Sequence, residues 1–380
     1  MTERRTSQRG DAEGMDVLIV GGGSAGTAAA CLLAQSERRV LLIDRPPQQG
    51  VPHAHAWISA AATPLLKKIG VTWKHATATA VREVAFHTAD FKKHQALRLA
   101  RPAAYFVETA SWTATLRQVA TQAGATCMDQ ATITAVQARE NDVVATCASG
   151  ASYPARLAII ADGAGSVSMT EIGLPAHRVR SPRYAAQLAW PAAKASKLGA
   201  GVLHFVLNLD GGQGMATFWS TGEVETVTTI AGEPATARSE LANIVAWLDR
   251  TQRVSRPATA DASTSPLLIV PAAHALEMDS HVGKRTLVIG EAGGFVAAPT
   301  GEGLYPGIWS AAIAATVIHD ALEGPHTQDA LRAFDTEWRT RMADYLRPPN
   351  TDLQFLLPLI FANEQMAARL AGAFLSGENL

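Results

Sequence analysis

Short apolar runs alternate with longer alanine-rich stretches at both ends of the chain. An almost continuous apolar run at 16–20 is typical of a buried parallel strand. Glycines, an alanine-rich stretch to about residue 34 and a second apolar run at 39–43 follow it. The same order returns near the other end, with an apolar run at 286–289, a glycine-rich turn and an alanine-rich stretch at 305–322. This order predicts a parallel sheet with helices packed on it.

The region between these two units is predicted to be richer in strands. Three strands are expected within 131–160, and residues 183–231 are strand-rich. The remaining predicted elements are helices at about 59–69, 112–124 and 237–249 and a loop at 45–56.

These elements predict an α/β fold in which a Rossmann-like dinucleotide-binding domain is assembled from separate pieces of chain. A β-sheet-rich substrate domain is inserted between the pieces, and helices close the chain. The expected divisions are a disordered tail at 1–14, the dinucleotide-binding domain at 15–75, 100–180 and 275–345, the substrate domain at 76–99 and 181–274, and a C-terminal helical segment at 346–380.

A glycine fingerprint opens the first helix. Gly21, Gly23 and Gly26 fit G-x-G-x-x-G, with Ser24 and Ala25 between the last two. The first glycine permits a tight turn, the second lets the backbone approach a pyrophosphate, and the third lets helix and strand pack closely. The helix N-terminus then presents free N–H groups to the anion. Asp44 ends the next strand, 21 residues after Gly23, where a ribose-binding carboxylate is expected.

Two later segments also carry strand-ending glycine turns. The first is the apolar run at 157–161 followed by Asp162 and Gly163. The second runs from Leu287 to Leu304 and includes Gly290-Glu291, then Pro299, then Gly301-Glu302-Gly303 at the start of a predicted helix. Glycines there let backbone N–H groups face a planar ring, and the helix N-terminus can stabilise negative charge.

Together the three segments resemble the FAD-dependent monooxygenases built on the p-hydroxybenzoate hydroxylase fold. Within them the geranylgeranyl-reductase-like and flavin-halogenase-like branch is the most similar. The resemblance covers residues 15–322 and implies a Rossmann-like FAD-binding domain of the glutathione-reductase type.

The resemblance also implies roles toward FAD. Asp44, with Arg45 beside it, is expected at the adenosine ribose, and Gly290-Glu291 at the ribityl chain. The other residues implied for FAD are the glycine loop (Gly21, Gly23, Ser24, Ala25, Gly26) at the pyrophosphate, Asp162, Gly163 and Pro299 in the same site, and Gly301, Glu302, Gly303 and Leu304 beside the isoalloxazine.

The chain departs from the family pattern at two cofactor positions. Glu291 stands where the family carries Asp, which adds a methylene and shifts the ribityl contact. Many relatives carry an arginine in the segment 105–109, where this chain has Glu108.

The loop before the helix at 59–69 departs as well. Relatives carry Gly-Glu there, whereas this chain has His53 and His55. Their unperturbed pKa lies near neutrality, so either side chain could transfer a proton or contact the flavin, or both could be ordinary solvated imidazoles. Flavin halogenases carry a lysine on this helix; the matching position is Thr63, and no W-x-W-x-I-P segment occurs, so halogenation is disfavoured.

The strand at 214–220 is expected to line the substrate pocket. Phe218 and Trp219 lie on opposite faces of this strand, so only one can point into the pocket. Trp219 is taken as the candidate, with His53 and His55, for a catalytic role. The alternative for each is ordinary core packing, and an apolar or aromatic small molecule is the expected substrate.

Composition narrows the class of protein. The net charge of −1 gives no excess of basic residues that would indicate nucleic-acid binding. The three cysteines lack metal-ligand spacing, so no metal site is expected, and their sparse use fits a reducing cytoplasm. No stretch reaches the length of about 20 apolar residues that a transmembrane helix needs.

Four functions follow from these features. The first is a monooxygenase that hydroxylates an apolar or aromatic substrate with NAD(P)H and O2. The second is a flavin-dependent reductase of C=C bonds in isoprenoid-type substrates. The third, suggested by the ending at 347–361, is a flavoprotein that modifies a residue of a partner protein during quinone-cofactor maturation. The fourth is a non-catalytic flavoprotein.

Overall fold

The computed structural model describes residues 14–46, 55–166, 182–212, 214–257, 259–348 and 353–378. His53 and the expected tail as far as residue 13 lie outside the described residues.

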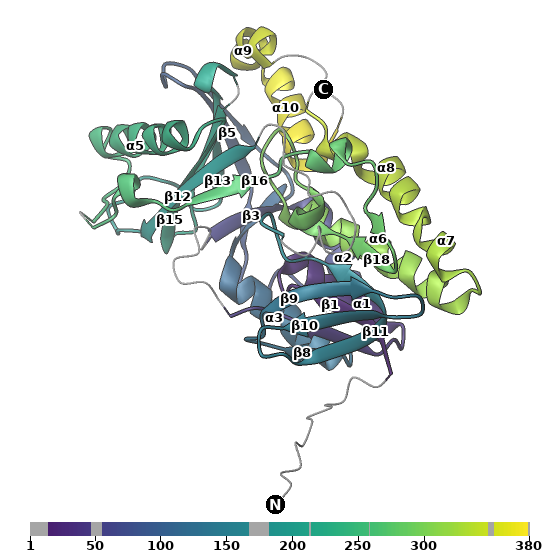
Figure 1. The fold of residues 1–380 in the computed structure, drawn as a ribbon. Coiled ribbons are helices and arrows are strands. Elements are labelled where there is room, and N and C mark those ends of the chain that lie inside the picture. The colour runs from purple at the N-terminus through teal and green to yellow at the C-terminus, as the bar shows by residue number, and fades with distance from the viewer. Residues whose placement is uncertain are drawn as a thin grey trace, which may run out of the picture.

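An eight-stranded sheet forms the first layer of the molecule (Figure 1). Strands β1, β2, β8, β11 and β18 pair in parallel in the order β18-β11-β1-β2-β8, while β17, β9 and β10 are antiparallel additions. The bounds are β1 Met15–Val20, β2 Val40–Ile43, β8 Thr126–Met128, β9 Ile133–Ala138, β10 Val143–Cys147, β11 Ser152–Ile160, β17 Val282–Gly283 and β18 Thr286–Val288.

The two faces of this sheet are covered differently, because successive side chains of each strand point to opposite sides. Val17 and Ile19 pack with helices α1, α3 and α6 on one face. Leu18 and Val20 pack against β9 and β10 on the other. Both faces are therefore apolar, as expected for parallel strands. The helices on the face that carries Val17 and Ile19 are α1 Ser24–Gln35, α2 Thr63–Ile69, α3 Thr109–Gln122, α6 Leu304–Glu323, α7 Thr327–Leu331 and α8 Ala333–Leu346.

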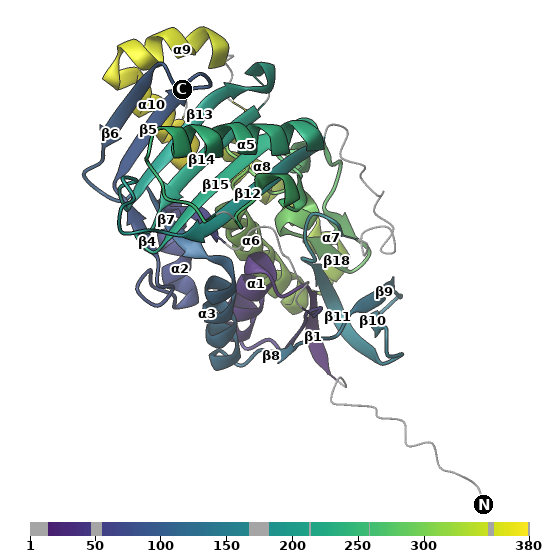
Figure 2. The same ribbon diagram turned by 90° about the vertical axis from the view of Figure 1, so that its left-hand side faces the viewer.

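A seven-stranded sheet, in the order β16-β12-β15-β14-β13-β5-β6, forms the second layer (Figure 2). A small three-stranded sheet, β3-β7-β4, accompanies the two large ones. The bounds are β3 His55–Ser59, β4 Thr79–Val81, β5 Glu83–Thr88, β6 His94–Arg98, β7 Ala104–Glu108, β12 Arg183–Pro191, β13 Val202–Leu209, β14 Gly214–Ser220, β15 Val224–Ala231 and β16 Leu267–Val270.

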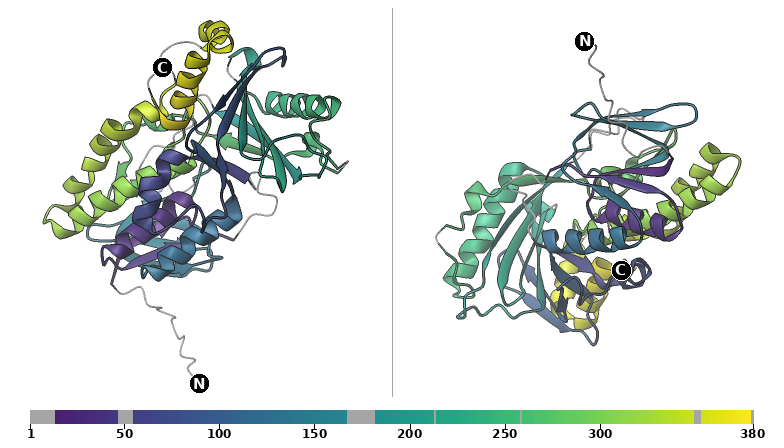
Figure 3. Two further views of the ribbon diagram at one scale, coloured as in Figure 1. Left: turned by 180° about the vertical axis from the view of Figure 1, so that it is seen from behind. Right: turned by 90° about the horizontal axis from the view of Figure 1, so that it is seen from below.

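Helices cover both faces of the seven-stranded sheet (Figure 3). Helix α5, Pro234–Arg250, packs on the face that carries Phe218. Helix α10, Glu364–Ser376, packs on the face that carries Phe205, together with α9, Leu353–Ala362. No helix among the described residues has both the length and the apolar character needed to cross a membrane.

The α/β fold class, with an inserted antiparallel sheet and closing helices, is therefore confirmed, but some element boundaries were wrong. The expected loop at 45–56 ends earlier, because His55 already pairs with Glu108 across β3 and β7. The expected helix at 59–69 begins at Thr63, after a 3₁₀ turn at Ala60–Ala62 that Ser59 caps by accepting a hydrogen bond from the N–H of Ala61. Helix α3 begins at Thr109, earlier than residue 112.

Replacing Phe374 of α10 with alanine tests how strongly the C-terminal helix is held. The Phe374 ring is 1% exposed and meets the rings of Phe86 and Phe205 edge-on, at centroid distances of 6.1 and 5.4 Å. Phe374→Ala should lower the free energy of unfolding by about 3–5 kcal/mol, measured by urea denaturation. Phe355→Ala on α9, where the ring is 79% exposed, is the control and should change it by less than about 0.5 kcal/mol. Equal effects of the two variants would contradict this packing.

Candidate cofactor and substrate site

The glycine loop packs its backbone against neighbouring strands and helices. At Gly21, which has φ +105°, an added Cβ would lie 2.3 Å from the carbonyl oxygen of Ala161, after β11. At Gly26 an added Cβ would lie 2.0 Å from the carbonyl oxygen of Gly21. Around Gly23, in contrast, no heavy atom of another described segment lies within 4 Å of the Cβ position. The first and third glycines are therefore needed for packing, and the second borders open space.

The residues between these glycines tie α1 to other helices. The Ser24 hydroxyl accepts a hydrogen bond of 2.9 Å from the indole N–H of Trp112 on α3. The methyl of Ala25 lies 2.8 Å from where a Cβ on Gly290 would stand. No side chain of the residues that the structure describes caps the N-terminus of α1, which leaves its N–H groups directed to the open space.

Asp44 and Asp162 follow neighbouring strands of the parallel sheet. Because the carboxyl ends of parallel strands meet at one edge, the loops after β1, β2 and β11 lie together there. Gly163 has φ +91°, and within the described part of the chain no atom beyond its own neighbours in sequence lies within 4 Å of its Cβ position. Asp44 is half-buried and pairs with Arg117 of α3 at 2.9 Å, whereas Arg45 is exposed.

The segment after β18 forms a turn against α6. Gly290 has φ +62°, and its N–H donates to the Ser310 hydroxyl at 3.1 Å. The Glu291 side chain is exposed toward the cavity beside it. A Cβ on Gly303 would lie 3.0 Å from a Glu291 carboxylate oxygen, so Glu291 lies against the start of α6.

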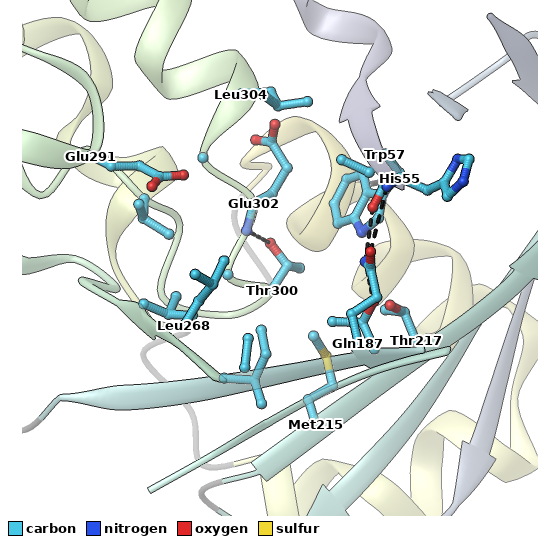
Figure 4. A pocket seen from close by; sticks show the side chains of 18 of the residues that line it. His55, Trp57, Gln187, Met215, Thr217, Leu268, Glu291, Thr300, Glu302 and Leu304 are labelled. Atoms are coloured by element: carbon cyan, nitrogen blue, oxygen red, sulfur yellow. Dashed lines mark hydrogen bonds between the residues drawn. The ribbon is translucent and has the colours of Figure 1, made fainter. Parts of the chain in front are cut away.

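A cavity separates this segment from the seven-stranded sheet (Figure 4). The cavity has a volume of about 180 Å³. Met215, Thr217 and Trp219 of β14 form part of one wall, and Thr300 to Leu304 form the facing wall. Gln187 reaches in from β12, and most of the remaining lining is apolar. Strand β14 and the segment 300–304, which are distant in sequence, therefore border one pocket.

Glu302 is buried at the start of α6. Its carboxylate accepts hydrogen bonds from the Tyr305 N–H, at 2.7 Å, and from the Tyr345 hydroxyl of α8, at 3.0 Å. Burial removes water from the carboxyl and raises its pKa to about 8, although the two hydrogen bonds act in the opposite direction. Glu302 can therefore hold a proton near neutral pH at the edge of the pocket.

His55 and Trp219 both border the pocket. The Gln187 side chain bridges to the His55 backbone, with its amide donating to the His55 carbonyl at 2.8 Å. The imidazole meets the Trp219 ring edge-on at 6.2 Å. Desolvation lowers the pKa of His55, and the Glu108 carboxylate partly offsets this. Trp219 is 1% exposed and stacks on Phe106 at a centroid distance of 4.1 Å, so its ring is held rigidly at the pocket wall. An indole side chain does not titrate near neutral pH.

Pro299 is not among the residues that line this pocket. It lines a neighbouring cavity of about 730 Å³ that also borders Arg183 and shares Met215 with the first. Sequence reasoning also missed three residues at the site: Arg117, Gln187 and Tyr345. Nothing in their local sequence marks them, because each reaches the site from an element distant in sequence from its partner.

The open space at Gly23 and Gly163 fits an extended anionic dinucleotide such as FAD. In the described part of the chain, no group of three or more histidine, cysteine, aspartate or glutamate side chains could hold a metal ion.

Two glycine variants should separate packing from cofactor binding. Gly26→Ala forces a methyl into a backbone carbonyl and should destabilise the protein by about 1–3 kcal/mol or prevent folding. Gly23→Ala should melt like the wild type but bind FAD at least about tenfold more weakly, because its methyl fills the open space. Thermal melts and flavin fluorescence titrations measure the two effects. A Gly23→Ala protein with wild-type FAD affinity would place the pyrophosphate elsewhere.

Glu302 should make stability depend on pH. Its pKa in the folded protein lies above the ordinary value of 4.5, so between about pH 4.5 and 8 the folded state keeps a proton that the unfolded chain releases. This stabilisation is complete below that range and is lost as the pH rises through it. Glu302→Gln should therefore gain at least about 1 kcal/mol relative to the wild type across this range, measured by denaturation at each pH. A difference that stays constant with pH would mean that Glu302 is ionised throughout.

Comparisons with known proteins agree with this geometry. The family described as FAD binding domain matches residues 14–347, while no curated protein matches the chain. A geranylgeranyl bacteriochlorophyll reductase-like protein from Thermoplasma acidophilum has a similar structure, with a TM-score of 0.75 and 17% identity over 96% of each chain. The flavin-dependent brominase Bmp2 has a TM-score of 0.72 and 13% identity, over 96% of this chain and 93% of that one. CtdE, solved in complex with FAD, has a TM-score of 0.65 and 15% identity, over 95% of this chain and 99% of that one.

At these identities the structural likeness concerns the fold, whereas the family match covers most of the chain. The chain belongs to the FAD binding domain family, and it has the fold of the FAD-dependent monooxygenases.

Proposed function

We propose that this protein is an FAD-dependent monooxygenase that hydroxylates an apolar or aromatic small molecule, with NAD(P)H and O2 as co-substrates. The observation that carries the proposal is the mostly apolar pocket between β14 and the start of α6. It joins the wall that the family resemblance assigns to the flavin with a wall of Met215, Thr217 and Trp219.

The chain's own residues would divide the work. The glycine loop and the N-terminus of α1 would hold the pyrophosphate, Asp44 the adenosine ribose, and Asp162 and Gly163 the neighbouring part of the dinucleotide. Residues 300–304 would border the isoalloxazine. When bound, FAD would supply the redox chemistry, in which two electrons from NAD(P)H and two from the substrate reduce O2, so that one oxygen atom enters the substrate and the other, with a proton from solvent, leaves as water.

The pocket side chains would position the substrate and keep water out. Trp219, fixed by its stacking on Phe106, would present a rigid aromatic surface. Gln187 and Thr217 are two of the polar lining residues that could orient a substrate hydroxyl. Free Cys31, Cys127 and Cys147 support activity in the reducing cytoplasm.

A second candidate is reduction of a C=C bond in an isoprenoid-type substrate. Glu302 favours it, because alkene reduction needs a proton as well as a hydride, and this buried carboxyl has its pKa raised to about 8 at the pocket edge. One structure of similar fold is described as geranylgeranyl bacteriochlorophyll reductase-like.

Oxygen labelling separates the two candidates. The FAD-loaded protein is mixed with NADPH, a panel of apolar aromatic compounds and isoprenoid alkenes under ¹⁸O2, and the products are analysed by mass spectrometry. Monooxygenation predicts one ¹⁸O atom in the product and NADPH consumption coupled to O2 uptake. Saturation of an alkene without O2, with no labelled product, would overturn the proposal in favour of the reductase.

Replacing His55 tests whether its imidazole acts at the pocket. His55→Ala should slow flavin reduction or turnover by at least about tenfold while changing FAD affinity less, since His55 borders the substrate pocket rather than the glycine loop. Stopped-flow absorbance and fluorescence titration measure the two quantities. His75→Ala, at an exposed position away from the pocket, is the matched control. Unchanged kinetics in His55→Ala would leave His55 a structural residue.

A further inference from the structure

Arg117 of α3 is held between two carboxylates at the carboxyl edge of the parallel sheet. One guanidinium nitrogen lies 2.9 Å from Asp44 Oδ2, and another pairs with Asp129. Asp44 follows β2 and Asp129 follows the adjacent β8. The Arg117 side chain is 17% exposed, so solvent does not fully screen these contacts.

The same guanidinium lies directly over the glycine loop. A Cβ added to Gly22 would stand 2.0 Å from Arg117 Nη2 and 2.5 Å from Asp44 Oδ2. Any side chain at position 22 would force this pair to shift. The adjoining residue, Gly23, borders the open space at the N-terminus of α1. A guanidinium paired with two carboxylates therefore lies beside the place where the fold would accept a pyrophosphate.

Charge balance makes the position of Arg117 significant. Glu108, which is exposed at the N-terminus of α3, carries a negative charge. Arg117 lies nine residues further along the chain, on the same helix. A pyrophosphate bound at the loop would otherwise meet the carboxylates of Asp44 and Asp129 with no nearby cation from α3.

We propose that Arg117 binds the ADP half of FAD. It holds Asp44 by Oδ2, so that Oδ1 accepts a hydrogen bond from the adenosine ribose, and its guanidinium offsets the carboxylate charge that the pyrophosphate would otherwise meet. The inference rests on FAD binding, which the family shows, and not on the reaction that the bound flavin performs.

A purely structural role for Arg117, fastening α3 to the ends of β2 and β8, makes a different prediction. Removal of either carboxylate partner would then resemble removal of the arginine. A cofactor role predicts opposite signs for the two partners. Losing Asp44 removes the ribose acceptor, whereas losing Asp129 leaves Arg117 with more unneutralised charge for the phosphates.

The test compares Arg117→Met, Arg117→Lys, Asp44→Asn and Asp129→Asn. Dissociation constants for FAD come from quenching of flavin fluorescence, and those for ADP from displacement of FAD. Arg117→Met keeps most of the aliphatic stem, and each variant is checked by its thermal melt. Titrations at low and high salt separate the ionic contribution.

We expect Arg117→Met to weaken FAD and ADP by the same factor, at least about tenfold, with a smaller dependence on salt than the wild type. Arg117→Lys should recover part of the loss, because it keeps the charge but not the paired contacts. Asp129→Asn should bind FAD as tightly as the wild type or more tightly, and Asp44→Asn more weakly.

Wild-type FAD affinity in Arg117→Met would overturn the proposal. It would also be overturned if Arg117→Met and Asp129→Asn weakened FAD binding equally and both lowered the melting temperature. These results are independent of the reaction. A chain that binds FAD through Arg117 but fails to oxygenate any substrate would refute only the proposed monooxygenase activity.

Discussion

The first turn of α1 can lie against the ends of β1, β11 and β18 only because the contact positions carry no side chain larger than a methyl. Gly21 faces the Ala161 carbonyl, Gly26 faces the Gly21 carbonyl, and Gly290 faces the methyl of Ala25. These contacts join the first strand–helix unit to the last one. They also leave the N-terminus of α1 uncapped at an open edge of the sheet, which is where an anion is most favourably bound.

The second consequence of this packing is a pocket with two unlike walls. The start of α6, placed beside Ala25, supplies main-chain groups and the buried Glu302. The seven-stranded sheet supplies Met215, Trp219 and other mostly apolar surface. A wall of backbone and helix terminus suits a charged, planar cofactor, and an apolar wall suits an uncharged substrate. The division of labour between the two layers of the fold therefore follows from which side chains each layer presents.

Much of this arrangement could be predicted from the sequence because its signals are local. The glycines at 21–26, the Asp162-Gly163 turn and the Gly290 to Leu304 segment each follow a recognisable apolar strand, so their place at the sheet edge follows from chain order. What could not be predicted depends on contacts between distant elements. Arg117 reaches Asp44 across 73 residues, Tyr345 reaches Glu302 from α8, and Gln187 reaches His55 from the other sheet. The early start of β3 at His55 has the same origin, since only pairing with β7 makes that segment a strand.

Uptake of FAD by the purified chain tests the central claim most directly. The apoprotein is incubated with excess FAD, separated from free cofactor, and its flavin and protein contents are measured together with the visible spectrum. We expect one FAD per chain, bound with perturbed flavin absorbance bands, and a lower FAD content when Gly23 is replaced by alanine. A folded wild-type chain that retains no FAD, or a Gly23→Ala chain that retains as much as the wild type, would contradict it.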